Sequence, residues 1–370
     1  MLSYYYIFPF EAGLMQIDNL RLTLQFHIKR KNRTDKRDCV LIAAHRSFEK
    51  NNEAMPFTEN VLVGGKTMFI DENGKTWYKG NLHTHTTVSD GRKTPEEAIA
   101  LYKENGYDFL ALTDHWKGSV GKVTEDGMLL LPGCEYNVHG ADVLEGVFHV
   151  VAIGEKQPAA LDRTDAALGA QEVVDAVHAV GGIAILAHPA WSLDTCEQIM
   201  ALHGFDGVEI YNSVSGLPRN CRPYSGEVID QIAVRGVVYP CMAADDSHFY
   251  ENEACYSYIY VQADALTEEA VLDAIRAGRV MATQGPRFHI TKERAENGTD
   301  WVVTLTCDPV ETVIFYTGSV WHNQRSLHAE NGEGLTCGTF VLRPQDRFVR
   351  VEVIDKNGKH GYATPILYEA

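Results

Sequence analysis

The chain has 370 residues, of which 45% are hydrophobic and 22% are charged, a composition typical of globular proteins with a large core and more than one domain. Its formal net charge of −17 repels nucleic-acid backbones and anionic membrane surfaces, so we expect neither a nucleic-acid polymer nor a membrane as partner. The charge does not exclude a small anionic substrate, because bound divalent cations dominate the field inside a site.

The eight cysteines are scattered without a CxxC pair, which favours reduced thiols in a cytoplasmic protein over a disulfide framework. The N-terminal segment MLSYYYIFPFEAGLM is apolar, but it lacks basic residues, and Pro9 and Glu11 interrupt it. It is therefore a poor signal peptide and too short to span a membrane, and Met15 is an alternative start.

Residues 1–77 are predicted to form a small β domain. The segment NLRLTLQFHIK at 19–29 alternates strictly between apolar and polar side chains, which indicates a half-buried strand. Two more strand-like runs follow, CVLIA at 39–43 and KTMFI at 66–70, and Asn73-Gly74 is typical of a hairpin turn.

From Gly80, short apolar runs alternate with helical patterns, which predicts βα units around a parallel sheet. The first helix is expected after Thr94 as its N-cap, with Pro95 at the first helical position and Gly106 beyond the last turn. Further helices are expected near 170–180, 194–203, 223–235 and 267–278. Strands are expected at 79–83, 108–113, 128–134, 146–152, 183–187, 206–211 and 237–243. About seven strands can close or nearly close a barrel, so residues 78–288 are predicted to be an α/β barrel domain.

The pattern becomes all-β again after Phe288. The runs WVVTLTC, TVIFYTG, GTFVL and RFVRVEVID are strand-like, and Asn357-Gly358 is a turn signal. Residues 289–370 are therefore predicted to form a β-sandwich-like domain.

Residue types that bind metals follow most of the predicted strands of the central region. His83 and His85 come after the first strand, Asp114 and His115 after the second, and Glu135 after the third. His149 lies within the fourth strand, His188 comes after the fifth, and Asp246 and His248 come after the seventh. In a barrel of parallel strands, the C-terminal strand ends form one rim that collects functional groups. Imidazole and carboxylate are ligands for Zn²⁺, Mn²⁺ and Fe²⁺, and crowded carboxylates without cations would repel one another. In a chain with 15 histidines the HTH tripeptide alone is a weak signal, but the whole series predicts a metal cluster.

Six motifs over residues 79–287, HTHTTVSDG, LTDH, GCEYN, FHVVAIG, LAHPAW and ADDSH, resemble in this order those of the PHP (polymerase and histidinol phosphatase) metallohydrolases. The resemblance implies a distorted barrel of seven βα units, here flanked by small β domains, that holds two or three divalent metal ions. The likeness is greatest to the PHP phosphoesterases and to the carbaryl-hydrolase-like branch.

Carried over by position, the resemblance implies three metal sites: one held by His83, His85, Glu135 and Asp246, a second held by Glu135, His149 and His188, and a third among Asp90, His115 and His248. Many relatives have histidine where this chain has Asp90. The harder oxygen ligand favours Mn²⁺ or Mg²⁺ there, or weakens the third site.

The resemblance implies hydrolysis of a small phosphorylated compound, such as a nucleotide, by a hydroxide that bridges two metals of the Zn, Mn or Fe type. Asp246 or His248 is expected to carry the proton to the leaving group, and the spacing D-x-H favours Asp246 over Asp245. Asp114 either ligates a metal or orients an imidazole. Four basic residues near strand ends are candidates for binding the phosphate: Lys117, Arg219, Arg222 and Arg287.

Two alternatives remain. The same ligands would serve attack on a carbonyl carbon, so the chain is alternatively a carbamate or carboxylic ester hydrolase of the carbaryl-hydrolase-like type. A second alternative is a non-catalytic binding protein on the same scaffold, although all nine ligand positions carry metal-competent side chains.

Overall fold

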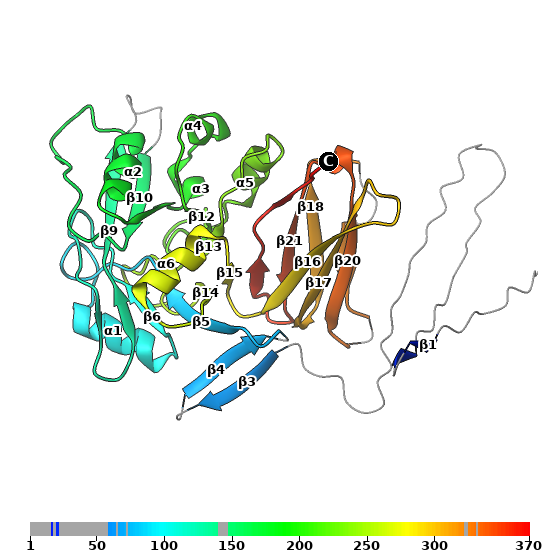
Figure 1. Ribbon diagram of the computed structural model, residues 1–370. Helices are drawn as coiled ribbons and strands as arrows, with labels where there is room; N and C mark the ends of the chain where they lie inside the picture. The colour runs from blue at the N-terminus through cyan, green and yellow to red at the C-terminus, as the bar shows by residue number, and fades with distance from the viewer. Residues whose placement is uncertain are drawn as a thin grey trace, which may run out of the picture. The chain divides into compact units, whose positions relative to one another are not determined.

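The computed structural model describes residues 16–17, 20–21, 58–63, 66–71, 73–139, 147–321, 325–330 and 332–370 (Figure 1). By its internal contacts the chain divides into two compact units, Met1–Pro56 and Phe57–Ala370. In the first unit, β1 (Gln16–Ile17) pairs with β2 (Leu20–Arg21) in antiparallel fashion. The rest of the strand expected at 19–29 and the strand expected at 39–43 lie outside the described residues.

A β-hairpin leads into the larger unit. Strand β3 (Thr58–Val63) pairs with β4 (Lys66–Asp71), and β4 pairs with β5 (Thr76–Asn81), both antiparallel. The expected turn at Asn73-Gly74 is confirmed: Gly74 has φ +72°, and its amide donates to the carbonyl of Asp71 at 2.9 Å. Because glycine has no Cβ, it adopts this left-handed conformation without strain.

Strand β5 belongs to a 13-stranded sheet with the order β19-β18-β21-β22-β15-β14-β5-β6-β8-β7, onto which β3, β4 and β23 are paired. Strands β5, β6 and β8 are parallel, as expected for βα units, whereas β14 is antiparallel to β5. The sequence analysis did not anticipate β14 or β15. The strands of this part after β5 are β6 (Phe109–Ala111), β7 (Lys122–Val123), β8 (Leu129–Leu131), β14 (Tyr258–Gln262) and β15 (Val280–Thr283).

A separate five-stranded sheet has the order β13-β12-β11-β10-β9. Its strands are β9 (Gly133–His139), β10 (Val147–Ile153), β11 (Ile183–Leu186), β12 (Gly207–Asn212) and β13 (Cys241–Ala244). Strands β11, β12 and β13 are parallel, but β10 is antiparallel to both β9 and β11. The expectation of a wholly parallel sheet is therefore wrong at β10.

The single strand expected at 128–134 is two strands in different sheets. Strand β8 pairs with β6 in the large sheet, and β9 begins the five-stranded sheet two residues later. Pro132 lies between them and has no N–H to donate to a neighbouring strand, so the ladder ends there.

The helices lie close to the predicted positions. Helix α1 (Pro95–Glu104) begins with a capping box, in which the Thr94 hydroxyl accepts from the amide of Glu97 at 3.3 Å and the Glu97 carboxylate accepts from the amide of Thr94 at 2.9 Å. The other helices are α2 (Ala170–Ala179), α3 (Pro189–Ser192), α4 (Cys196–Met200), α5 (Gly226–Ala233) and α6 (Glu268–Arg276), of which α3 was not predicted. No helix in the described ranges has the length and apolarity to cross a membrane.

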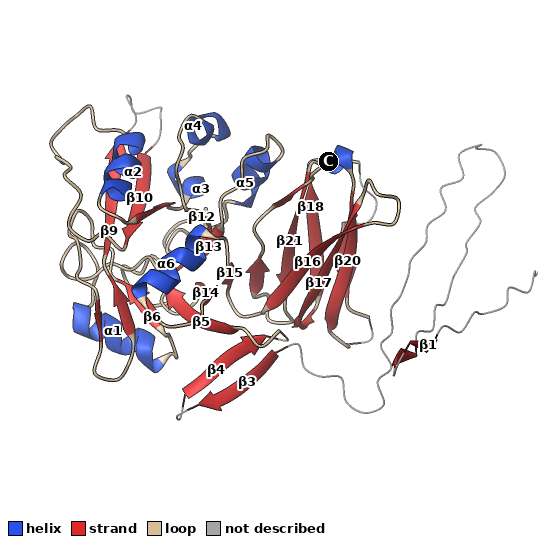
Figure 2. Ribbon diagram, in the orientation of Figure 1, coloured by secondary structure: helices blue, strands red, loops and turns tan. Residues whose placement is uncertain are grey.

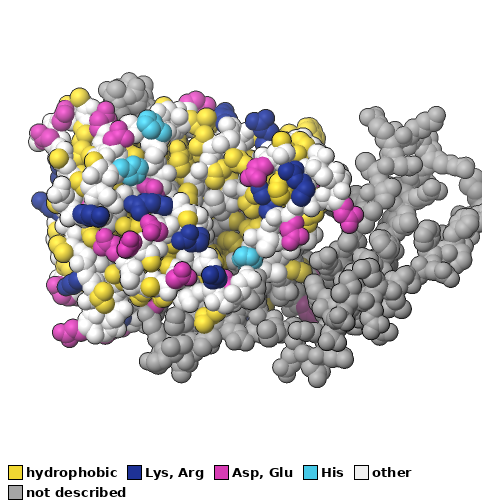
Figure 3. All heavy atoms as spheres, viewed as in Figure 1, with side chains coloured by type: hydrophobic (Ala, Val, Ile, Leu, Met, Phe, Trp, Pro, Cys, Tyr) yellow, Lys and Arg dark blue, Asp and Glu magenta, His cyan; other side chains and the backbone are white. Residues whose placement is uncertain are grey.

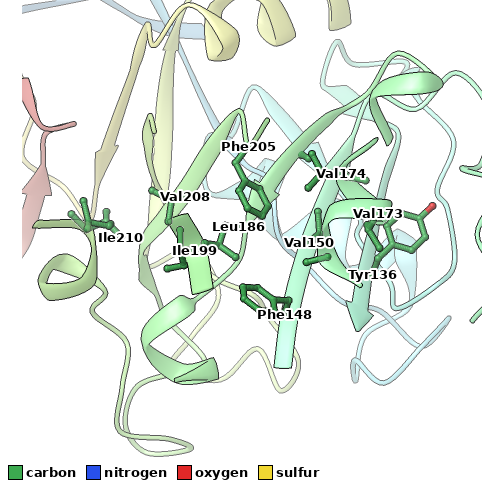
Figure 4. Close-up of a cluster of buried hydrophobic side chains, with 14 of the residues drawn as sticks. Tyr136, Phe148, Val150, Val173, Val174, Leu186, Ile199, Phe205, Val208 and Ile210 are labelled. Carbon is green, nitrogen blue, oxygen red and sulfur yellow. The ribbon is translucent and has the colours of Figure 1, made fainter. Parts of the chain in front are cut away.

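Helices α2, α4 and α5 pack on the five-stranded sheet around one apolar cluster (Figure 4). Helix α2 buries Ala170, Val173, Val174 and Val177, which recur at the spacing of one helix face. They contact the same cluster as Val150 of β10. Full burial of each such valine stabilises the fold by about 1.5–3 kcal/mol, so this cluster holds the strands that carry the site.

The C-terminal residues form two β layers, as the sequence predicts (Figure 2). One layer is the sheet β16-β17-β20, and the other is the end of the large sheet that contains β18 and β21. Alternate residues of β17, Val303, Leu305 and Cys307, are buried between the layers against Phe315 and Val351. The elements here are β16 (Phe288–Arg294), β17 (Trp301–Val310), β18 (Thr312–Thr317), β19 (Ser326–His328), β20 (Leu335–Leu342), η1 (Pro344–Asp346), β21 (Phe348–Ile354), β22 (His360–Tyr362) and β23 (Ile366–Leu367).

A buried ion pair joins these layers to helix α5. The guanidinium of Arg350, on β21, is fully buried and donates to both carboxylate oxygens of Asp230 at 2.7 and 2.9 Å. It also donates to the hydroxyl of Tyr224 at 2.9 Å. The large sheet itself also runs from the C-terminal layers to the strands around β5.

The fold as a whole is mixed α/β with far more strand than helix. The two large sheets meet at isolated parallel bridges between Thr84 and Ser247 and between His115 and Glu135. No sheet among the described residues closes on itself, so these residues do not show a continuous seven-stranded barrel. The two bridges lie where the polar motifs of the sequence come together.

Candidate metal centre

All nine residues proposed as metal ligands lie together at the junction of the two sheets. They form three overlapping groups, and within each group the ligand atoms lie within 4.8 Å of one another. The groups are His83, His85, Glu135 and Asp246; Glu135, His149 and His188; and His85, Asp90, His115 and His248. Because Glu135 and His85 each belong to two groups, the arrangement suits a cluster of cations rather than one isolated ion.

The HTH tripeptide follows β5 and is completely buried. In extended backbone, residues two apart point to the same side, so His83 and His85 face the cluster together. Gly91 ends this motif in close contact with the backbone of His85, where a Cβ would lie 2.2 Å from the carbonyl oxygen. Only glycine fits at that position without moving His85.

Asp114 holds the loop after His85 instead of facing the cations. Its carboxylate accepts from the amide and hydroxyl of Thr86, both at 2.7 Å, and from the amide and hydroxyl of Ser89 at 3.1 and 2.7 Å. The Ser89 hydroxyl in turn lies 3.4 Å from His85 Nδ1. Asp114 therefore orients His85 through Ser89.

In the first group, imidazole nitrogens and carboxylate oxygens converge without hydrogen bonding to each other. His83 Nε2 and His85 Nε2 each lie 3.1 Å from Asp246 Oδ1, and they lie 3.2 and 2.9 Å from Glu135 Oε2. Around a cation with ligand bonds of about 2.1 Å, neighbouring ligands are about 3.0–3.4 Å apart. The spacing matches ligands arranged around a common ion.

Four polar atoms at this point are buried and lack a hydrogen-bond partner: His83 Nε2, His85 Nε2, His115 Nδ1 and Asp246 Oδ1. A buried polar atom without a partner costs about 1–3 kcal/mol, so four together in the middle of a fold require an explanation. A cation bonded to these atoms supplies it. The residues present therefore fit a divalent metal.

The second group depends on the antiparallel direction of β10. His149 pairs with Asn137 across the β9–β10 ladder, which places it diagonally across from Glu135 on the same face. His149 Nδ1 lies 2.6 Å from Glu135 Oε1, and His188 Nε2 lies 3.5 Å from the same oxygen. Trp191 packs edge-on against both imidazoles, and its exposed part borders solvent.

The third group is looser and faces solvent. The Asp90 side chain is 53% exposed, and its carboxylate oxygens lie 3.5–3.8 Å from nitrogens of His85, His115 and His248. His248 Nδ1 lies 2.9 Å from the carbonyl of Asp246, which leaves Nε2 facing Asp90. This group is therefore the open end of the site.

Without cations, the buried carboxylates favour the protonated form of His83. Burial alone lowers the pKa of His83, but the carboxylates of Asp246, Glu135 and Glu209 outweigh it and raise the pKa well above its usual value. Burial raises the pKa of Glu135, but the imidazoles beside it, His83 and His149 foremost, lower it well below its usual range. Metal ions and protons thus compete for the same atoms.

Two residues that the sequence analysis missed orient the ligands. Glu209 on β12 lies 2.8 Å from His83 Nδ1, and it accepts from the amide of His188 at 2.9 Å and from Asn212 Nδ2 at 2.8 Å. Asn212 also donates to Asp246 at 3.2 Å. A carboxylate behind a ligating imidazole fixes its ring and tautomer. The signal was a lone acidic residue in the apolar run GVEIY.

The neighbouring Asp245 faces away from the cluster. Its carboxylate is fully buried and accepts from the amides of Cys255 and Ser257 at 2.7 Å and from the Tyr102 hydroxyl at 2.9 Å. Burial raises its pKa to about 6. Of the two aspartates, Asp246 alone points at the ligand groups, as the D-x-H spacing indicates.

The backbone is in the left-handed region at two of the proposed ligands. His188 has φ +29° and Asp246 has φ +52°. For residues other than glycine such conformations cost about 1–3 kcal/mol and are concentrated at functional sites. At both positions the fold thus gives up stability to place a side chain.

The four basic candidates have different environments. Lys117, Arg219 and Arg222 are exposed in loops after strands of the two sheets, and Arg219 stacks on Phe249 with its Cζ 4.1 Å from the ring centroid. Arg287 has another partner: its guanidinium donates to Asp308 at 2.9 and 3.1 Å and stacks on Phe69.

No family model and no curated protein matches the chain. Among solved structures it is similar to a two-domain protein from Bacteroides vulgatus that contains a predicted PHP-like metal-dependent phosphoesterase (TM-score 0.45, 14% identity, 80% of this chain and 96% of that chain). It is also similar to a proposed metal-dependent phosphoesterase from Bifidobacterium adolescentis (TM-score 0.34, 17% identity, 54% and 96%). A third is an amidohydrolase from Chromobacterium violaceum solved with bound sulfate and no metal (TM-score 0.34, 15% identity, 47% and 89%). The name of the first contains the family that the sequence motifs resemble, and the carbaryl-hydrolase-like branch stays a prediction.

Proposed function

We propose that the chain is a metal-dependent hydrolase, and specifically a phosphoesterase that acts on a small phosphorylated compound. The observation that carries the proposal is the sharing of Glu135 between two ligand groups, with Oε2 facing the first and Oε1 facing the second. Cations that share ligands lie close enough to act on one substrate group, as in two-metal phosphoesterases. The orphaned buried atoms of His83 and Asp246 point to the same conclusion.

Each group would hold one divalent cation of the Zn, Mn or Fe type, and the two buried groups that share Glu135 would fill before the more exposed third group. When bound, such a pair lowers the pKa of water and neutralises charge on a phosphoryl group. The chain's part is to fix the ligands: Glu209 orients His83, and Ser192 Oγ, 3.2 Å from His188 Nδ1, orients His188. A third cation among Asp90, His115 and His248 is the least enclosed of the three.

His248 can move a proton only if the third group is empty. Its Nδ1 is engaged by the carbonyl of Asp246, so Nε2 is the nitrogen that faces the open end. With the third group empty, the protonated Nε2 would be free to donate to the leaving group. With a cation held there, Nε2 would serve as a ligand and could not donate a proton. The two roles exclude each other, so metal content decides between them.

The barrel expected from the sequence is part of the proposal. Two observations support it: the Thr84–Ser247 bridge joins the end of β5 to the end of β13, and the His115–Glu135 bridge joins the end of β6 to β9. These contacts connect the two sheets on both sides of the site. A distorted barrel around the cations would result if the bridges extended into ladders.

A metal-reconstitution assay tests the proposed function. Metal-free protein is loaded with Mn²⁺, Zn²⁺ or Fe²⁺, analysed for metal content, and offered p-nitrophenyl phosphate, a naphthyl ester and a naphthyl carbamate in parallel. We expect at least two ions per chain and phosphate release with at least one metal, and Glu135→Gln should abolish both. Release of naphthol without phosphate would favour the ester or carbamate hydrolase. Fewer than about two ions per chain would favour a binding protein.

A further inference from the structure

Two arginines stack on one phenylalanine at the open end of the site. The Cζ atoms of Arg92 and Arg219 lie 4.5 and 4.1 Å from the ring centroid of Phe249. They come from separate loops, since Arg92 follows the HTHTTVSDG motif and Arg219 follows β12. Stacking on an aromatic ring fixes a guanidinium plane and leaves its N–H groups free to donate.

The backbone connects this arginine pair to the third ligand group. Phe249 follows His248, and Arg92 lies two residues after Asp90. The amide of Arg92 donates to the carbonyl of His248 at 2.8 Å. Because both arginines are exposed, whereas Glu135 and His83 are buried, the guanidiniums lie on the solvent side of the cluster.

Within the described part of the chain, neither guanidinium has a carboxylate partner. Both guanidiniums are therefore able to bind an anion from solution, in a protein whose net charge is −17. On the face drawn in Figure 3, basic side chains are interspersed with acidic ones. Other arginines are paired, Arg350 with Asp230 and Arg287 with Asp308.

The two charges repel each other unless an anion lies between them. Both Cζ atoms are close to the same centroid, so they are at most about 9 Å apart, comparable with the Debye length at physiological ionic strength. A phosphate or carboxylate that accepts from both guanidiniums would remove this repulsion and gain charge-assisted hydrogen bonds. Arg92 and Arg219 thus form a candidate anion clamp in which no protein carboxylate of the described residues pairs with either guanidinium.

We propose that Arg92 and Arg219 bind a second anionic group of the substrate, beyond the phosphoryl group that is cleaved. The substrate class is then a small phosphate ester that carries another phosphate or a carboxylate. The inference rests on the proposed function, because it assumes that the scissile group lies at the buried ligands. Phe249 is a positioning residue that aligns the two guanidiniums.

Binding of matched phosphonates to the Mn²⁺-loaded protein tests the clamp without turnover. The probes are 3-phosphonopropionate against propylphosphonate, and 5-phosphonopentanoate against pentylphosphonate, so each pair has equal length and differs by one carboxylate. In calorimetry, the carboxylate-bearing phosphonate should bind at least about tenfold more tightly than its alkylphosphonate partner at one of the two lengths. Equal affinities within both pairs would overturn the proposal.

Variants assign the preference to the clamp. Arg92→Gln and Arg219→Gln should each remove most of the roughly tenfold preference and leave alkylphosphonate affinity unchanged. Phe249→Leu should weaken it while both charges remain. Arg235→Gln, which removes an equal charge from a surface pair with Glu197, is the matched control and should change nothing. Equal losses for both members of a pair would mean that the arginines hold the scissile group, which contradicts the proposal.

Hydrolysis of p-nitrophenyl phosphate separates this inference from the proposed function. Turnover of that substrate without a carboxylate preference would refute the clamp alone. A carboxylate preference without turnover of any phosphate ester would refute the phosphoesterase and leave the anion clamp standing.

Discussion

Replacing Glu209 by glutamine tests whether the residues behind the ligands control metal binding. The carboxylate accepts from three donors: His83 Nδ1 at 2.8 Å, the amide of His188 at 2.9 Å and Asn212 Nδ2 at 2.8 Å. Glutamine keeps one acceptor oxygen and places an NH₂ where the other was, so at least one buried donor faces another donor. We expect the metal-free variant to lose about 1–3 kcal/mol of unfolding free energy.

The same change should weaken metal binding, because the imidazole of His83 loses its orienting partner. Loss of such a partner lowers metal affinity by roughly 10- to 100-fold, or about 1.4–2.8 kcal/mol. Chelator competition gives the affinity, and urea unfolding of the metal-free protein gives the stability. Glu227→Gln, at an exposed position in the first turn of α5, is the matched control. Reduced stability with unchanged metal affinity would refute the orienting role.

Three further predictions concern separate parts of the molecule. Asp90→Ala should remove only metal bound at the third group, so elemental analysis should show no more than one ion lost per chain, and loss of a second ion would contradict this assignment. Burial lowers the pKa of His248, but Asp246 and Asp90 outweigh it and raise the pKa from 6.5 to about 9. The protonated His248 therefore stabilises the metal-free protein fully below pH 6.5, and this stabilisation of at most about 3 kcal/mol is lost between pH 6.5 and 9. A urea midpoint that rises over this pH range would contradict the pairing. Arg350→Leu removes the guanidinium from the buried carboxylate of Glu352 and the partly exposed carboxylate of Asp230, and it should cost about 3 kcal/mol with unchanged metal content. A stability close to that of the native protein would disprove this prediction.

The grouping of the candidate ligands was predictable because its signal is local. A histidine or carboxylate just beyond an apolar run marks a strand end, and strand ends of neighbouring βα units meet at one edge. His188 lies two residues beyond β11 and Asp246 two residues beyond β13, where the D-x-H spacing rather than adjacency to the run selects Asp246 over Asp245. The start of α1 was equally predictable, since Thr94, Pro95 and Glu97 act on the helix at whose N-terminus they lie.

Strand direction and sheet membership were not predictable in the same way. The run VFHVVAI has the same apolar pattern whether its strand is parallel or antiparallel, so the reversed direction of β10 leaves no mark in the sequence. The transfer of the chain between sheets at Pro132 was missed because LLLPGCE reads as one apolar run. Glu209 was missed because a single carboxylate inside a strand shows its role only through the partner that it faces.

The fold places the ligands before any metal binds, and the backbone and the protons share that task. Left-handed conformations at His188 and Asp246 cost about 1–3 kcal/mol each, and they persist only if the surroundings hold them. The surroundings do so: Glu209 accepts from the amide of His188, and the amide of Asp246 donates to the carbonyl of His83 at 2.9 Å. In the metal-free protein, a proton on His83 offsets negative charge on Glu135 and Asp246. Each cation that enters must displace such protons, so metal affinity should rise as the pH increases.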